Sequence, residues 1–202
     1  TLPADVSVAH APIEAIPALI RDRRPHVVLH TAAAWRTEDE AQAVVVAGTR
    51  GIAEAAAEVG ARLVHLSTDL VFDGEHGPYS EDDSPAPVNF YGAAKAEAER
   101  IVAATLSDAV IVRTSLVTCF DPPDPRTEPI LAALRGERAP MTLFTDEYRC
   151  PVRTDDLAAA LVELAQNDFT GILHVAGPQR LSRHALGLRI AAYHNLPPDA
   201  AL

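Results

Sequence analysis

The sequence predicts an α/β protein built on a doubly wound parallel sheet, and two observations support this fold class. Short apolar runs rich in β-branched residues, such as HVVLHTAA (26–33) and ARLVHLST (61–68), are typical of strands buried on both faces. These runs alternate along the chain with longer amphipathic stretches that favour helices. Alternation of this kind is expected when helices connect parallel strands.

Each remaining element follows from a local pattern. PIEAIPALIRDRR (12–24) predicts a helix before the first strand, and TRGIAEAAAEVG (49–60) predicts a helix that ends at Gly60. Clustered Gly, Pro and acidic residues predict a loop over 73–89. The other expected elements are a helix over 90–104, a strand over 109–117, a helix over 128–137, a helix over 154–166 with Thr154 as its N-cap, and a strand over 171–177.

Composition bounds the class of protein. The 202 residues are 48% hydrophobic and carry a net charge of −11, which fits one main globular unit and argues against nucleic acid or an anionic membrane as a partner. No apolar run approaches the ~20 residues of a membrane helix, and no basic-then-apolar leader begins the sequence, so we expect a cytoplasmic protein. Cys119 and Cys150 form no CxxC pattern, so neither a disulfide framework nor a metal site is expected.

Lys95 is the most informative single residue, because it is the only lysine in a chain with sixteen arginines. It follows Tyr91 by four residues, so a helix would present both side chains on one face. A nearby ammonium favours the phenolate form and lowers the phenol pKa from about 10, which makes the pair a tuned acid/base. The same ammonium could bind ribose hydroxyls of a nucleotide cofactor.

Thr68 ends a predicted strand, where doubly wound sheets bind ligands, and its hydroxyl could hydrogen-bond a substrate carbonyl. YxxxK alone is a weak motif, and an exposed helix pair is the plain alternative. The order of strand, long loop and helix around these residues favours the site.

The segment LVHLSTDLVFDGEHGPYSEDDSPAPVNFYGAAKAEAERIV (63–102) resembles the extended short-chain dehydrogenase/reductases. It is most similar to their dTDP-4-dehydrorhamnose reductase branch, the RmlD substrate-binding family. VVLHTAA, VRTSLV and DEYRCPVRTDDLA (146–158) extend the resemblance over most of the chain. It implies a Rossmann-type NAD(P)-binding domain over 1–118, followed by a substrate-binding lobe over 119–202 that interleaves with the last strands of the sheet.

The resemblance also implies an activity, the reduction of a nucleotide-linked 4-keto-6-deoxysugar by NADPH or NADH, with a homodimer as a candidate assembly. Tyr91 is then the acid/base, Lys95 binds the nicotinamide ribose, and Thr68 orients the carbonyl. The implied cofactor contacts are Thr31, Ala32, Ala33, Ser67, Tyr91 and Lys95. The implied contacts to the nucleotide-diphosphate sugar are Thr68, Val71, Phe72, Asn89 and Leu116.

The sequence departs from the family pattern at several points. No GxGxxG motif occurs, so the N-terminal glycine-rich βα unit is absent from these residues. Val45 stands where the family commonly has Asn, and Leu116 where a tryptophan is frequent. Leu70 follows Asp69 where sugar-nucleotide dehydratases of the superfamily carry Glu, which favours reduction over dehydration.

Two alternatives stay open. Epimerases of the superfamily use the same Tyr, Lys and Ser/Thr set. A non-catalytic regulatory subunit is also compatible, because the same branch includes one for methionine adenosyltransferase and a fold does not fix a function. Arg113, Arg149 and Arg153 are candidates for pairing a substrate diphosphate, although an ordinary structural role is favoured for each singly. His30 is expected to be a satisfied core residue.

Overall fold

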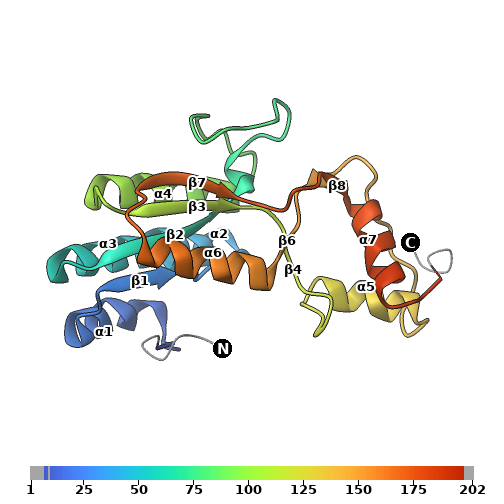
Figure 1. The fold of residues 1–202 in the computed structure, drawn as a ribbon, viewed down its shortest axis with the longest axis horizontal. Helices are drawn as coiled ribbons and strands as arrows, with labels where there is room; N and C mark the ends of the chain where they lie inside the picture. The colour runs from blue at the N-terminus through green and yellow to red at the C-terminus, as the bar shows by residue number, and fades with distance from the viewer. Residues whose placement is uncertain (1–6, 9, 198–202) are drawn as a thin grey trace. The chain divides into compact units, whose positions relative to one another are not determined.

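The computed structural model describes residues 7, 8 and 10–197, and its main sheet has the predicted parallel α/β architecture (Figure 1). The strands are ordered β1 (Val27–His30), β2 (Arg62–Thr68), β3 (Val110–Thr114) and β7 (Gly171–Val175). In the parallel pair of β1 and β2, Val27 lies opposite Arg62 and His30 opposite His65. The segments that follow these two strands therefore leave the sheet at the same edge.

Three helices share a core with the sheet: α1 (Ile16–Arg23, after a 3-10 turn η1 at Ile13–Ala15), α3 (Gly48–Val59) and α4 (Phe90–Thr105). The buried members of this core are Ile20, Ile52, Ala53, Ala55, Leu63, Val102, Ala109 and Ile111. They come from both the helices and the strands. Burial of this apolar face, rather than helix propensity, is what fixes short helices of this kind in place.

The helix before β2 ends as predicted. Gly60 follows α3 with φ 71°, a left-handed conformation that glycine adopts without strain, and its amide bonds back to the last turn. The sequence did not predict the segment before α3, where α2 (Glu38–Glu40) continues into a π-helical stretch, η2 (Ala41–Ala47). Thr37 caps α2 by accepting a hydrogen bond from the Glu40 amide.

The chain divides into two compact units, residues 1–113 with 163–173, and residues 114–162 with 174–202. In the second unit β4 (Val117–Thr118) pairs in parallel with β6 (Val152–Arg153), and β5 (Tyr148–Arg149) pairs antiparallel with β8 (Leu181–Ser182). Its helices include α5 (Thr127–Leu134) and α7 (Arg183–Tyr193). They pack on a cluster formed by Leu116, Ile130, Leu131, Ala133, Leu134, Leu186, Ile190 and Ala191.

Among the differences from the expected elements, two involve contacts between residues far apart in the sequence. The strand predicted over 109–117 is divided: β3 ends at Thr114, the Ser115 hydroxyl accepts a hydrogen bond from the Cys150 amide, and β4 begins at Val117. Thr154 is the first residue of α6 (Thr154–Gln166) instead of its N-cap, and its hydroxyl donates to the Thr118 carbonyl. Both contacts reach across more than thirty residues, which a local pattern does not reveal. Among the described residues, no helix combines the length and apolar character that a membrane span requires.

Candidate active site

The candidate site begins at the carboxyl end of β2, the edge where doubly wound sheets bind ligands. Thr68 is the last residue of β2 and only 7% exposed. Its Oγ1 accepts a hydrogen bond from the Leu70 amide at 3.3 Å and lies 3.4 Å from Asp69 Oδ1. The chain then turns through η3 (Asp69–Val71). The bond to the Leu70 amide, in the turn that follows Thr68, thus orients the Thr68 hydroxyl.

The start of α4 lies directly against this turn, and Gly92 makes the approach possible. A Cβ atom at Gly92 would lie 2.1 Å from the Leu70 carbonyl oxygen, so any residue other than glycine would overlap that oxygen. Asn89 caps the same helix, since its Oδ1 accepts a hydrogen bond from the Gly92 amide at 2.8 Å. The glycine and the cap together fix Tyr91 beside the end of β2.

Lys95 lies one turn further along α4 and is 2% exposed. Its Nζ donates to the Leu66 carbonyl at 2.9 Å. Burial lowers the Lys95 pKa to about 8, and the Glu99 carboxylate acts against this shift. The alternative of an exposed helix pair is therefore wrong for Lys95, because the ammonium is held in the interior against β2.

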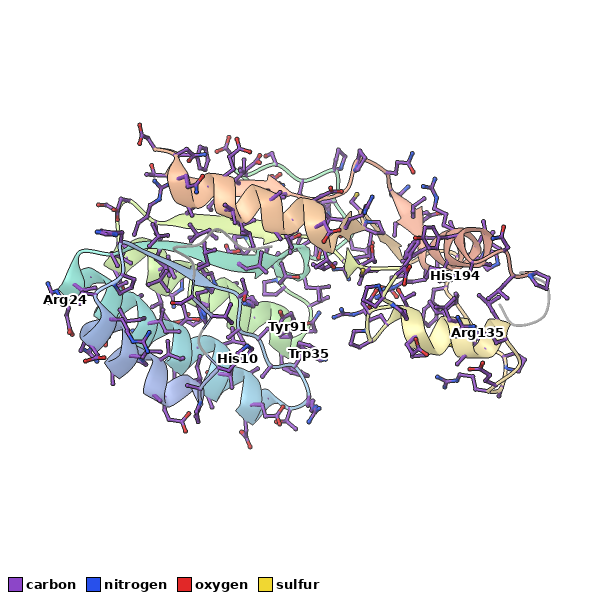
Figure 2. All side chains as sticks on the ribbon, turned by 60° about the horizontal axis from the view of Figure 1, so that its bottom comes forward. His10, Arg24, Trp35, Tyr91, Arg135 and His194 are labelled. Atoms are coloured by element: carbon purple, nitrogen blue, oxygen red, sulfur yellow. The ribbon has the colours of Figure 1, made fainter. Side chains whose placement is uncertain are left out.

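Tyr91 contacts Trp35, which lies in the segment after β1. The ring of Trp35 contacts it edge-on, with ring centroids 6.4 Å apart and planes at 75° (Figure 2). Trp35 itself is 57% exposed, so it borders the site instead of filling the core. Tyr91 also packs against a buried cluster that includes Val45 and Ala94.

The structure places the other predicted contact residues in several environments. Thr31 is exposed, and Ala32 and Ala33 are half-buried directly after β1. Val71 is fully buried, and Phe72 is stacked on Tyr79 with ring centroids 4.2 Å apart. Ser67 is buried, and its hydroxyl donates to Glu99. Leu116 lies in the core cluster of the second unit. The binding roles of these residues stay predictions.

Arg113, considered for a substrate diphosphate, instead binds a buried carboxylate. Its guanidinium donates to both oxygens of Glu99, and both side chains are buried. Arg153 is largely exposed beside Asp155, on the surface of the second unit. These placements agree with the structural role that was favoured for the two arginines.

Two buried histidines, His30 of β1 and His65 of β2, lie in the sheet near Lys95. His30 is buried with Nε2 3.0 Å from Thr49 Oγ1, as expected of a satisfied core residue. Burial, and then the Lys95 charge, lowers the His30 pKa to about 4. The His65 ring lies 5.2 Å from that of His30, and neither of its nitrogens has a hydrogen-bond partner among the described residues. Burial also lowers the His65 pKa well below its usual value.

Sequence reasoning missed Glu99 and His65. The spacing of Glu99, four residues after Lys95, signals a shared helix face, but nothing in the spacing reveals its burial. His65 sits inside an apolar strand whose pattern gives no hint of a neighbouring lysine. Across the part of the chain that the structure describes, no three His, Cys, Asp or Glu side chains gather as a metal site would require.

The second unit contains its own pocket, of about 290 Å³. Apolar side chains make up most of its wall, among them Leu116, Ile130 and Phe144, and Arg126 lies at its lining. Arg183 also lines it, and its Nε donates to Glu147 Oε1 at 2.8 Å. The pocket combines an apolar wall with guanidinium groups.

A parallel sheet whose strand ends in Thr68, followed by a helix that carries Tyr91 and Lys95 one turn apart, has the architecture of the extended short-chain dehydrogenase/reductases. Within that class, the chain belongs to the family described as the RmlD substrate binding domain, whose model matches residues 6–200. The family inferred from the motifs is therefore confirmed.

Individual relatives agree with this family. A dTDP-4-dehydrorhamnose reductase from Sinorhizobium fredii is 33% identical over 172 residues, which cover 78% of this chain and 57% of that protein. The methionine adenosyltransferase 2 subunit beta of Xenopus laevis is 29% identical over 198 residues, which cover 91% of this chain and 59% of that protein. The chain thus spans about three-fifths of the length of these relatives.

Solved structures give the same result. The dTDP-4-dehydrorhamnose reductase of Bacillus anthracis in complex with NADP is 28% identical, with a TM-score of 0.81 over 92% of this chain and 68% of that one. A hypothetical dTDP-4-dehydrorhamnose reductase of Sulfolobus tokodaii is 30% identical, with a TM-score of 0.80 over 97% of this chain and 73% of that one.

Proposed function

We propose that the protein is an NAD(P)H-dependent reductase that acts on a nucleotide-linked 4-keto-6-deoxysugar, as in dTDP-rhamnose biosynthesis. The observation that carries the proposal is the buried Lys95 ammonium, held at the end of β2 one turn after Tyr91. A buried ammonium is costly, and such groups concentrate at functional sites. The reductase relatives add independent support.

The residues present fit the nicotinamide end of NADPH or NADH. Lys95 has three N–H donors, of which one binds Leu66, so donors remain for ribose hydroxyls. Ala32 and Ala33 follow β1 directly, are half-buried and have small side chains, which suits the approach of a cofactor. The 202 residues contain no GxGxxG motif for the pyrophosphate. When bound, the cofactor supplies a hydride to the keto carbon.

The protein's own groups handle the carbonyl oxygen. The Thr68 hydroxyl turns from Asp69 to donate to that oxygen, which orients the carbonyl. As hydride reaches the carbon, the Tyr91 phenol gives its proton to the forming alkoxide, and the product is an alcohol. The Lys95 ammonium stabilises the resulting phenolate, and a proton from solvent restores the phenol. One hydride and one proton are thus added across the C=O bond.

The pocket of the second unit is a candidate site for a nucleotide or a sugar ring. Its apolar wall, which includes Leu116, suits a base or sugar ring, and the guanidinium of Arg126 suits a phosphate oxygen. This assignment keeps residues 119–202 as a substrate-binding lobe. A homodimer and a cytoplasmic location stay predictions.

A second candidate function is a non-catalytic subunit that binds a dinucleotide or a nucleotide sugar. It is favoured by the methionine adenosyltransferase 2 subunit beta relatives, which cover more of this chain than the reductase relative does. The presence of Thr68, Tyr91 and Lys95 together argues for catalysis, because binding alone does not require a tuned acid/base.

The test is to add NADPH or NADH with a dTDP-linked 4-keto-6-deoxysugar to the purified protein and to follow cofactor absorbance. We expect oxidation of the cofactor that depends on the sugar. Binding of cofactor or sugar, measured by calorimetry, without any oxidation would favour the non-catalytic subunit and reject the reductase.

A further inference from the structure

The face of α4 that carries Tyr91 and Lys95 continues into a second buried charge. Glu99 follows Lys95 by four residues, so the two side chains are neighbours on that face. Glu99 is 4% exposed. A carboxylate in such a place requires partners, because an unpaired buried charge is strongly destabilising.

Consecutive residues of β2 bind these two turns of α4. The Leu66 carbonyl accepts from Lys95 Nζ at 2.9 Å, and the Ser67 hydroxyl donates to Glu99 Oε1. Thr68 is the next residue along the strand. The strand end that orients the carbonyl is therefore joined to the catalytic helix by two adjacent contacts.

Arg113 of β3 completes the set. Its Nη2 lies 2.9 Å from Glu99 Oε2, and its Nε lies 3.2 Å from each carboxylate oxygen. Its Nη1 donates to the Asp83 carbonyl at 3.3 Å, and its Cζ lies 5.0 Å from the centre of the Phe72 ring. Glu99 is thus the point where β2, β3, α4 and the loop over 73–89 are tied together.

We propose that Glu99 is a positioning residue for the Tyr91 and Lys95 pair: its carboxylate, fixed by Ser67 and Arg113, holds α4 on β2 and supplies a negative charge one helical turn from the Lys95 ammonium. The catalytic consequence of this role rests on the proposed reductase function. The role itself is a property of the fold and can be measured without substrate.

The electrostatics agree with the geometry. Burial lowers the Lys95 pKa to about 8, and Glu99 is the group that acts in the opposite direction. The other titratable groups of this region include Tyr91 of α4, together with His30 of β1 and His65 of β2, and burial keeps both histidines neutral at pH 7. Arg113 of β3 contributes a further positive charge, paired to Glu99.

The single lysine makes a direct experiment possible. Protein labelled with ¹³C and ¹⁵N only in lysine gives one side-chain ammonium signal, and its titration by NMR reports the pKa of Lys95. We expect Glu99→Gln to lower this pKa by about one unit, a tenfold weaker hold on the proton. The matched control is Glu97→Gln, on the surface of the same helix, where Glu97 pairs with Arg100; it should leave the Lys95 pKa unchanged.

Glu99→Gln leaves Arg113 buried without its carboxylate, so this variant can fail to fold. The double variant Glu99→Gln with Arg113→Met removes both charges and should also titrate at lower pH than the wild type. Glu99→Asp keeps the negative charge, so the Lys95 pKa in this variant should lie close to the wild-type value. A Lys95 pKa that is unchanged in the folded variants, or that rises toward 10.5, would overturn the positioning role.

Kinetics separate this inference from the proposed function. In an active enzyme, the alkaline limb of kcat/KM should move to lower pH in the double variant by the shift that NMR measures. A wild type without any turnover rejects the reductase, whereas the NMR titration still decides the role of Glu99. An active double variant with an unmoved alkaline limb rejects the role of Glu99 alone.

Discussion

Lys95 is buried at the end of β2, where its ammonium loses most of its contact with water. The lowered pKa, from 10.5 to about 8, corresponds to about 3 kcal/mol of destabilisation at neutral pH. Its bond to the Leu66 carbonyl offsets only a part of this, on the order of 1 kcal/mol. A charge that the fold keeps despite this cost agrees with the catalytic role proposed for Lys95.

Substitution of Lys95 by methionine should separate stability from function. Lys95→Met keeps the length of the side chain and removes the buried charge, so we expect the free energy of unfolding to rise by about 1–2 kcal/mol at pH 7. Turnover should fall by about 100-fold or more, since the phenolate loses its cation. Urea unfolding and cofactor oxidation measure the two effects. Loss of stability together with full activity would contradict the assignment.

The same pKa predicts the pH dependence of the reaction. In the proposed mechanism the ammonium form of Lys95 is active, so kcat/KM should be constant below the Lys95 pKa and fall as pH rises above about 8. A series of initial rates from pH 6 to pH 10 measures this limb. A profile that stays flat to pH 10 would show that the ionisation of Lys95 does not matter for the reaction.

At the scale of elements, the site depends on how closely α4 approaches the turn after β2. Gly92 permits this approach, because any Cβ there would overlap the Leu70 carbonyl oxygen. The start of α4 and the turn η3 can therefore be displaced by a single methyl group. This contact joins the helix that carries Tyr91 to the turn that follows Thr68.

Gly92→Ala should consequently push α4 away from the turn. We expect the free energy of unfolding to fall by about 1–3 kcal/mol, as for other overpacked positions. Turnover should fall further than the decrease in the folded fraction explains, because the site geometry changes as well. Ala93→Ser, at the exposed neighbouring position of the helix, is the matched control. Thermal unfolding and turnover of the two variants measure the effect. Equal activity in both would mean that the close approach is not needed.

Sequence patterns predicted the elements whose determinants are local. The apolar run of β2, the helical pattern of α4 and the glycine after α3 each lie within one segment, and the structure confirms them. The break in the strand at Ser115 was not predictable, because it depends on the amide of Cys150, far along the chain. The π-helical segment η2 was missed because its Ala and Val run has no local signal for that geometry.

The candidate site divides in the same way. Tyr91 and Lys95 share one helix, so their spacing alone predicted a common face. The burial of Lys95 and its bond to Leu66 depend on how the helix packs on β2, and no spacing reveals that. The Glu99 contacts to Ser67 and Arg113 join three separate elements and became visible only in the fold.

At the scale of the whole molecule, the two buried histidines should make the fold sensitive to acid. The unfolded chain binds protons at its histidines below pH 6.5, whereas folding lowers the His30 pKa to about 4 and shifts the His65 pKa in the same direction. Stability is therefore present above pH 6.5 and lost as pH falls toward 4. Each histidine contributes a slope of at most about 1.4 kcal/mol per pH unit.

His65→Leu should flatten this dependence. The variant removes one buried proton acceptor and two ring nitrogens without partners among the described residues, so stability at pH 7 should be unchanged or higher. Between pH 6.5 and pH 4 its free energy of unfolding should fall less steeply than in the wild type. Urea unfolding at several pH values measures both effects. Parallel curves for the two proteins would contradict the account of His65.

The most direct measurement of the central claim is isotope transfer. The protein is incubated with a dTDP-linked 4-keto-6-deoxysugar and with NADPH or NADH that carries deuterium at the transferable position, and the sugar product is analysed by mass spectrometry. The account predicts deuterium on the former keto carbon with the wild type, and at least about 100-fold less product with Tyr91→Phe. An unlabelled product, no product with the wild type, or full activity in Tyr91→Phe would contradict it.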